Sequence, residues 1–333
     1  MSEPTPDLFV DAVMSYQKTA AIKAAIELGL FTVIGDGSES ANAIATKIVA
    51  SPRGIRILCD YLTVQGFLTK SGDKYQSTES TRKFLDLRSP SYIGGTVEFR
   101  AAPELIRWVL DDPVAYVRDG GSRGPSSLAP DHPIWVKFST AMVPFIAPCA
   151  DAIAGQVATW PIKPRKVLDI AAGHGLFGIA IAKALPKATI AAVDWESVLA
   201  VARGNAEEAG IVDRYRTIAG SAFDVDWGKG YDLALLPNFL HHFDYATCVA
   251  LLKKVRQSLT SKGKTLAVEF VPNEDRISPY VPAVFAFHML AFTPGGDAFT
   301  ATDLDSMARD AGFRSATVTS IAGSPESLVS MEQ

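Results

Sequence analysis

The sequence predicts an α/β protein with a mostly parallel, doubly wound sheet, preceded by a smaller, mostly helical domain. The length of 333 residues exceeds what one hydrophobic core usually organises, so two domains are expected. Helical apolar periodicity dominates the first hundred residues. From Arg165 onward short apolar strands alternate with helical runs, at 167–170, 190–193, 233–236 and 265–268, and this alternation is typical of a parallel sheet covered by helices.

The amino-terminal hundred residues predict a winged helix. An apolar helical face starts at Leu8, and Gly29 ends that helix. Two shorter helices are expected at 41–49 and 52–65, and a hairpin follows at 67–77. Small apolar residues on the first helix suit close packing against a second copy, so this domain is expected to serve in dimerisation.

Charge composition argues against a polyanionic partner. The chain has a formal net charge of −4, and residues 1–100 hold eleven Lys and Arg against eleven Asp and Glu. A winged helix that binds DNA needs a basic face for the phosphates, so nucleic acid is not an expected partner. A ligand-sensing DNA regulator is the least favoured of the alternatives.

Neither a membrane partner nor secretion is expected. The first residues lack the basic and then apolar order of a secretory signal. Three prolines cut the uncharged stretch 277–296 below the about 20 apolar residues that a spanning helix needs. Three scattered cysteines without metal-ligand spacing indicate reduced thiols and no metal site. The sequence therefore predicts a cytoplasmic protein.

The first strand of the α/β region leads into a glycine-rich turn and a helix. Asp169 lies on the strand, and Gly173, Gly175 and Gly178 follow it. These glycines also satisfy the dinucleotide fingerprint, with Asp194 about twenty residues on. Asp169, however, would repel the diphosphate of a dinucleotide, whereas a cationic sulfonium ligand tolerates its charge. The pattern therefore favours S-adenosylmethionine, with a helix-packing turn as the structural alternative.

Residues after the next strands extend this candidate cofactor site. Asp194 can accept hydrogen bonds from ribose hydroxyls, although a solvated aspartate is the simpler alternative. The turn that contains Phe223 is placed to border an adenine, with a core role for Phe223 equally open. The complete candidate set for the cofactor is Asp169, Gly173, Gly175, Asp194, Trp195, Ser221, Ala222, Phe223 and Asn238.

His241 and Glu269 are the candidate catalytic residues. Methylating a phenol or alcohol requires removal of its proton, and an imidazole can act as the general base near neutral pH. Glu269 ends the next strand and can orient that imidazole. His242 is expected to point away, because two adjacent histidines rarely point the same way. A lone histidine is also often structural.

Aromatic and apolar residues of two helical regions are candidates for the substrate pocket. Such a pocket is consistent with a planar phenolic or polyketide-like molecule, and each residue is equally compatible with an ordinary core. The candidates are Phe138, Met142, Phe145, Phe285, His288, Met289 and Phe292.

Taken in order, these motifs resemble the small-molecule O-methyltransferases typified by caffeate and acetylserotonin O-methyltransferases and their bacterial relatives. The resemblance covers nearly the whole chain. It implies a homodimer joined through the amino-terminal domains, S-adenosylmethionine in a Rossmann-like domain, and a substrate pocket between the domains. By position, His241 matches the family's general base, Glu269 its supporting carboxylate and Asp194 its ribose ligand. Phe138 and Met142 match pocket-wall positions.

This chain departs from the family pattern at several positions. Ala171 and Ala172 stand where the glycine loop usually has two more glycines. Ser221 replaces an acidic residue that often meets the adenine. The second glutamate that flanks the base in plant members falls at about Ala298, so the usual pair of carboxylates is incomplete.

We therefore expect an S-adenosylmethionine-dependent O-methyltransferase that acts on a small, aromatic molecule. The alternative is a family member that methylates carbon or nitrogen or carries out a non-methylating reaction. The expected domains are a winged-helix dimerisation domain at 1–100, a helical linker contributing to the substrate pocket at 101–150, and a Rossmann-like methyltransferase domain at 151–333.

Overall fold

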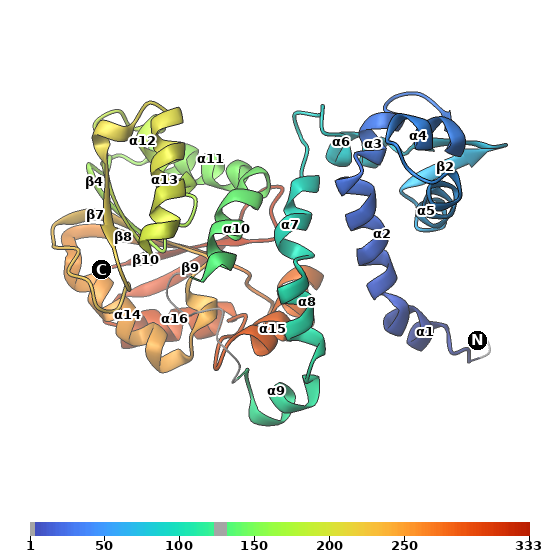
Figure 1. The fold of residues 1–333 in the computed structure, drawn as a ribbon. Coiled ribbons are helices and arrows are strands. Elements are labelled where there is room, and N and C mark those ends of the chain that lie inside the picture. The colour runs from blue at the N-terminus through green and yellow to red at the C-terminus, as the bar shows by residue number, and fades with distance from the viewer. Residues whose placement is uncertain (1–3, 123–131) are drawn as a thin grey trace. The chain divides into compact units, whose positions relative to one another are not determined.

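The protein is described by a computed structural model that covers residues 4–122 and 132–333 (Figure 1). Its contacts divide the chain into two compact units, Met1–Pro103 and Glu104–Gln333. The division falls within a few residues of the expected boundary at 100. The linker expected at 101–150 stays a prediction, and its residues from Glu104 onward are part of the second unit.

The first unit contains the helices and the hairpin in the predicted order. The helix expected from Leu8 onward is broken at Ser15, and Gly29 follows its second part with a left-handed φ of 63°. A short additional strand pairs with the hairpin to give the antiparallel order β1-β3-β2. The elements are α1 (Asp7–Met14), α2 (Tyr16–Glu27), α3 (Leu30–Ile34), β1 (Glu39–Ser40), α4 (Ala41–Lys47), α5 (Pro52–Val64), β2 (Leu68–Ser71), β3 (Lys74–Ser77), α6 (Glu79–Leu85) and α7 (Val97–Arg100).

Apolar side chains of this unit form one small core and one exposed face. Leu30, Phe31, Ile44 and Leu62 are among the residues of the core. Helix α1 contributes nothing to this core, because none of its residues is buried. Large apolar side chains on α1 are instead exposed to solvent in the single chain: Leu8, Phe9, Val10, Val13 and Met14.

The second unit is built on a seven-stranded sheet of order β6-β5-β4-β7-β8-β10-β9. The strands β4 to β8 run parallel, and β10 is antiparallel to both β8 and β9. All four predicted strands are present, and they are four consecutive strands of the sheet in the order β5-β4-β7-β8. The strands are β4 (Lys166–Ile170), β5 (Thr189–Asp194), β6 (Tyr215–Ala219), β7 (Tyr231–Pro237), β8 (Leu259–Glu269), β9 (Ser315–Ser320) and β10 (Ser327–Glu332).

Helices cover both faces of this sheet, as a doubly wound fold requires. Figure 1 shows α12 and α13 on one side of the sheet and α14 and α16 on the other. The helices are α8 (Pro103–Leu110), α9 (Pro113–Asp119), α10 (Pro133–Ala141), α11 (Val143–Thr159), α12 (Leu176–Ala184), α13 (Glu196–Glu208), α14 (Tyr245–Ser258), α15 (Tyr280–Phe292) and α16 (Ala301–Asp310).

No single helix in the described part of the chain is long and apolar enough to cross a membrane. Helices α10 and α11 reach the necessary length and composition only when taken together, and they are bent by 67° at the break between them.

The parallel strands carry the candidate site residues to one edge of the sheet. Strands β4, β5, β7 and β8 are neighbours in register, so their carboxyl ends meet there. Ligands of open α/β sheets bind at this edge.

Candidate active site

Asp169 is a fully buried carboxyl group near the end of β4, with an exposed fraction of 0%. Its Oδ2 accepts a hydrogen bond of 3.0 Å from the Gly178 backbone N–H of α12. Gly178 admits no side chain, because a Cβ there would lie 2.7 Å from Asp169 Oδ2. Oδ1 has no partner among the described residues, and burial raises the pKa of this carboxyl well above its usual range. One oxygen of this buried carboxyl is therefore not used in holding the fold among the described residues.

The glycine turn is held by Asp194, at the end of β5. The Gly173 N–H donates to Asp194 Oδ2 at 2.8 Å, and the Trp195 N–H donates to Oδ1 at 2.7 Å. Gly173 and Gly175 adopt left-handed φ values of 58° and 75°. Ala171 also has a positive φ of 53°, a conformation that glycine adopts at less cost. The alanine found in place of a glycine is therefore a strained residue of this turn.

Lys254 of α14 holds the turn that contains Ser221, Ala222 and Phe223. Its Nζ donates to three backbone carbonyls, those of Ala222 at 2.9 Å, Phe223 at 3.0 Å and Val225 at 2.8 Å. The ammonium also lies 4.1 Å from the centre of the Trp227 ring. Phe223 is exposed, so the alternative that it belongs to the core does not hold. Lys254 was not among the predicted site residues, because nothing in a helical lysine pair distinguishes it from its neighbour.

Asn238 begins the turn that follows β7. It has a left-handed φ of 54°, its N–H donates to the Val268 carbonyl at 2.8 Å, and its Oδ1 is buried without a partner among the described residues. A strained, non-glycine residue of this kind is often found at functional sites. The turn leads directly into the short 3₁₀ helix η3 (Leu240–His242).

His241 and Glu269 form a buried pair. His241 Nδ1 lies 2.6 Å from Glu269 Oε2, and both side chains are almost fully inaccessible to solvent. Glu269 Oε1 accepts the backbone N–H groups of Phe239 at 3.2 Å and Leu240 at 2.8 Å. Burial lowers the pKa of the His241 imidazole, which is therefore neutral at pH 7, and burial raises the pKa of Glu269. The predicted juxtaposition of these two residues is present.

The His242 side chain does not point away from this pair, contrary to our expectation. Its ring centre is 4.4 Å from that of His241, and its ring packs edge-on against Trp135 of α10 at 5.6 Å. Consecutive residues of a 3₁₀ helix are about 120° apart around the helix axis, so the two imidazole rings do not compete for the same space. The two imidazoles lie side by side.

The candidate pocket residues separate into two groups. Phe285 packs edge-on against His241 with ring centres 4.9 Å apart, and His288 and Phe292 continue this row along α15. Phe138 of α10 stacks on His174 in the glycine turn at 6.3 Å. Met142 and Met289 are buried in the interior, and Phe145 is half-buried on α11. Trp135 links the two groups, because its ring contacts both Phe138 and His242. It was not predicted as a site residue, since a tryptophan on an apolar helix is equally compatible with an ordinary core.

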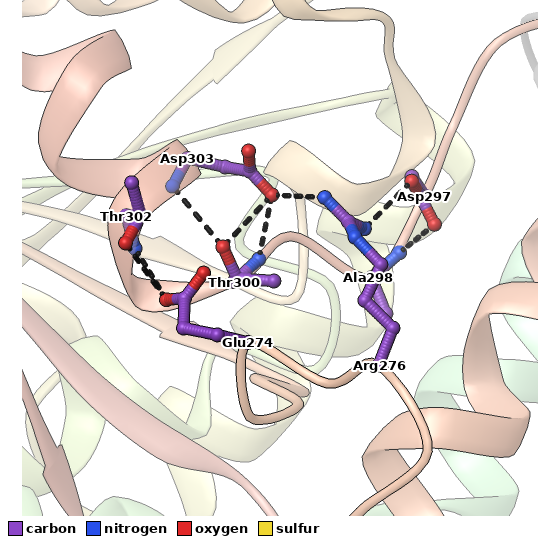
Figure 2. A network of polar contacts seen from close by, with 7 residues as sticks. All are labelled: Glu274, Arg276, Asp297, Ala298, Thr300, Thr302 and Asp303. Carbon is purple, nitrogen blue, oxygen red and sulfur yellow. Dashed lines mark hydrogen bonds and ion pairs between the residues drawn. The ribbon is translucent and has the colours of Figure 1, made fainter.

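The loop after α15 is hydrogen-bonded to the backbone of His241. The Asp297 N–H donates to the His241 carbonyl at 3.1 Å. Figure 2 shows Arg276 between Asp297 and Asp303, with distances of 3.4 and 2.6 Å. Ala298, which replaces the family's second glutamate, is buried, and the neighbouring Asp297 carboxylate is engaged by Arg276 and the Ala298 N–H. No carboxylate of this loop substitutes for the missing glutamate.

One thiol lies at the margin of this site, because the Cys248 S–H donates to the Leu240 carbonyl at 3.2 Å. The cysteines are free and buried, and burial raises their pKa values: Cys59, Cys149 and Cys248. Within residues 4–122 and 132–333, no group of three or more His, Cys, Asp or Glu side chains could hold a metal ion.

Two family profiles match the chain. The O-methyltransferase domain matches residues 129–314, and the O-methyltransferase dimerisation domain matches residues 10–86. The first match covers more than half of the chain. Both agree with the resemblance read from the sequence motifs.

Known proteins are similar over almost the full length. The 3-hydroxy-5-methyl-1-naphthoate 3-O-methyltransferase of Streptomyces sahachiroi is 26% identical over 321 residues, which cover 92% of this chain and 89% of that protein. A crystal structure from Nostoc punctiforme, described as a provisional O-methyltransferase, has 46% identity and a TM-score of 0.95 and covers 100% of both chains.

A third relative is the S-adenosyl-L-methionine-dependent methyl transferase PigF of Serratia sp., 25% identical over 332 residues that cover 96% of this chain and 94% of that protein. A solved structure described as PigF with SAH has 26% identity and a TM-score of 0.83, and covers 99% of this chain and 100% of that one. Together with the family profiles and the site geometry, these similarities show that the chain belongs to the O-methyltransferase family of S-adenosylmethionine-dependent enzymes.

Proposed function

We propose that this enzyme transfers the methyl group of S-adenosylmethionine to a phenolic hydroxyl of a small aromatic molecule, with His241 as the general base. The observation that carries the proposal is the buried contact of 2.6 Å between His241 Nδ1 and Glu269 Oε2. This pair lies at the sheet edge that also carries the glycine turn. A base held in one orientation beside a cofactor turn is what proton removal during methyl transfer requires.

The residues at the sheet edge fit the cofactor. S-adenosylmethionine carries an ammonium group, ribose hydroxyls and an adenine amino group, all of which donate hydrogen bonds. Asp169 Oδ1 and Asn238 Oδ1 are buried acceptors without a partner among the described residues. Asp194 has two carboxylate oxygens, each with a lone pair beyond the one that accepts a backbone N–H. We infer that these residues, Gly173, Gly175, and the 221–223 turn hold the cofactor.

The cofactor, when bound, supplies an electrophilic methyl group on a cationic sulfur. His241 accepts the proton of the acceptor hydroxyl at Nε2 while the new O–C bond forms and the S–C bond breaks. Glu269 accepts the hydrogen bond from Nδ1–H and so selects the tautomer in which Nε2 has a free lone pair. The backbone N–H groups of Phe239 and Leu240 hold the carboxylate in place.

The charge of Glu269 predicts the pH dependence of turnover. If Glu269 is protonated, it donates to Nδ1, and Nε2 then carries the proton and cannot act as a base. Burial raises the pKa of Glu269 to about 8, so the reactive form gains population as the pH rises through that value. We expect kcat, measured between pH 6 and 9, to rise and then level off.

Glu269→Gln is the matched control for this profile, because an amide has no proton to lose in this range. A rise caused by ionisation of the acceptor itself would remain in the variant, whereas a rise caused by Glu269 would disappear. A flat wild-type profile would contradict the assigned role of Glu269.

The acceptor class is supported by the relatives and by the aromatic rings near the base. Curated relatives are named as methyltransferases of a hydroxynaphthoate and of a phenazine. Aromatic side chains of α10 and α15 surround the imidazoles of His241 and His242. We therefore propose that α10, within the segment 101–150, and α15 contact a planar aromatic acceptor.

Methyl transfer from isotopically labelled S-adenosylmethionine to a panel of phenols, indoles and aromatic amines tests this proposal. We expect labelled methyl ethers of the phenols, identified by mass and by their lability to ether cleavage. Labelled carbon- or nitrogen-methyl products, or cofactor binding without any transfer to the panel, would instead support the alternative activities.

We also propose that the unit Met1–Pro103 joins two copies of the chain. Residues 10–86 match a dimerisation domain, and the exposed apolar side chains of α1 are a surface that a partner would cover. Phe9, at 71% exposure, and Leu8, at 85%, are the largest contributors to this face.

A further inference from the structure

Arg276, in the loop between β8 and α15, bridges two carboxylates that lie after α15. Its Nη2 donates to Asp303 Oδ2 at 2.6 Å and its Nη1 donates to Asp297 Oδ2 at 3.4 Å, as Figure 2 shows. The planar fork of an arginine presents separate N–H groups, whereas a lysine presents one charged nitrogen. The guanidinium therefore fixes Asp297 relative to the start of α16.

The Asp303 end of this bridge is fixed by a helix cap. Asp303 Oδ2 also accepts the Thr300 backbone N–H at 2.9 Å and the Thr300 hydroxyl at 3.0 Å. The Thr300 side chain accepts the Asp303 N–H in return, which completes the capping box of α16. Thr300 is buried. The Asp303 carboxylate therefore has little freedom, and it holds the guanidinium in one place.

The Asp297 end of the bridge reaches the backbone of the proposed base. The Asp297 N–H donates to the His241 carbonyl at 3.1 Å. Its Oδ1 accepts the Ala298 N–H at 2.8 Å, and its Oδ2 pairs with Arg276. The neighbouring Gly296 packs directly against the same carbonyl, because a Cβ there would lie 2.2 Å from the oxygen. A movement of Asp297 is therefore passed on to His241.

Arg276 has an unfavourable backbone conformation. Its φ of 58° lies in the left-handed region, which glycine and asparagine adopt at less cost. The turn around it is closed by hydrogen bonds, from the Arg276 N–H to the Asn273 carbonyl at 2.9 Å and from the Ile277 and Ser278 N–H groups to Asp275 at 3.0 and 3.1 Å. Strained residues are retained where the surrounding structure requires them, often at functional sites. An arginine at this position indicates that its guanidinium is used.

We propose that Arg276 is a positioning residue for methyl transfer, which holds Asp297 against the backbone of His241 so that the imidazole keeps its place. This inference rests on the proposed role of His241 as the base. Arg276 acts through Asp297. Their side chains are 48% and 42% exposed, so the coupling is modest in size and weakens with added salt.

Arg276→Asn removes the guanidinium and tolerates the left-handed backbone. We expect kcat for a methylated phenol to fall about 5-fold, which is the coupling that a half-exposed ion pair supplies. The acceptor KM and the affinity for S-adenosylhomocysteine should stay nearly unchanged. Arg276→Lys keeps a charge and should lose less. Glu274→Gln is the matched control with wild-type kcat, because Glu274 binds the Thr302 N–H and hydroxyl in the same network, away from Asp297 (Figure 2).

A double-mutant cycle tests whether Arg276 acts through Asp297. Asp297→Asn keeps the N–H that His241 accepts and an oxygen for Ala298, but it removes the charge that pairs with Arg276. In this background Arg276→Asn should lower kcat no further, whereas independent effects would multiply. Hydrogen exchange in peptides from residues 293–299 measures the same link without turnover. Arg276→Asn should speed exchange of the Asp297 N–H about 5-fold, and Glu274→Gln should leave it unchanged.

Each outcome decides the inference. Thermal unfolding checks that the variants fold, and Arg276→Lys carries the comparison if Arg276→Asn does not. If phenols are methylated but kcat of the Arg276 variants equals that of the wild type, or the losses multiply in the cycle, this inference is wrong and the proposed function stands. Faster exchange without a loss in kcat would also overturn it. If no phenol is methylated, the proposed function fails and this inference fails with it.

Discussion

Replacing His241 by alanine is expected to lower kcat by about 10²–10⁴-fold, the usual contribution of a positioned general base. The affinity for S-adenosylhomocysteine, measured by calorimetry, should stay nearly unchanged. The imidazole contacts Glu269 and Phe285, whereas the glycine turn is held separately by Asp194. A loss in turnover without a loss in binding therefore separates proton removal from cofactor binding.

Glu269→Gln is the graded control for this result. The amide can still accept the Nδ1 hydrogen bond of His241, but it has no charge to favour the required tautomer, so a smaller loss is expected. His242→Ala is not a silent control, because the His242 ring packs against the His241 ring. If His241→Ala methylates its acceptor normally, His241 is not the general base. Carbon methylation or a non-methylating role would then be the better assignment.

Gly296→Ala is expected to lower turnover by about 10²-fold, because it displaces the backbone of the base. A Cβ at Gly296 would lie 2.2 Å from the carbonyl oxygen of His241, which is far inside van der Waals contact. The same carbonyl accepts a hydrogen bond from the Asp297 N–H at 3.1 Å, so the loop and the His241 backbone cannot separate without breaking that bond. A displacement of about 1 Å at a reacting centre can cost this much in rate.

Gly295→Ala is the matched control for this prediction. Its Cβ would lie 3.2 Å from the Asp244 Cβ, a contact that a small shift relieves. Both variants are compared by kcat, by S-adenosylhomocysteine affinity and by thermal unfolding. Equal and nearly normal turnover of the two variants would show that the loop tolerates the extra atom and does not position His241.

Much of the site followed from strand ends in the sequence. Residues directly after apolar strands are brought together by a parallel sheet whatever the intervening helices do. That rule placed Asp169, Asp194, Asn238 and Glu269 at one edge, and the sheet order bears it out. The pairing of His241 with Glu269 was predicted on the same ground, since β7 and β8 are adjacent.

Other residues of the site could not be read from local patterns. The three carbonyls that Lys254 binds lie about thirty positions earlier in the chain. The contact of Trp135 with His242 joins residues more than one hundred positions apart. No periodicity or motif within either segment records such a contact.

The sequence by itself determined the doubly wound α/β domain, the glycine turn and the pairing of an imidazole with a carboxylate. These features depend on apolar periodicity and on the order of strands, which are local properties of the chain. Only the tertiary structure decided that His242 faces Trp135, that Gly296 abuts the His241 carbonyl, and that Asp297 does not replace the missing glutamate. Such details depend on the packing of distant segments at ångström distances, where one Cβ or one ring orientation changes which atoms meet.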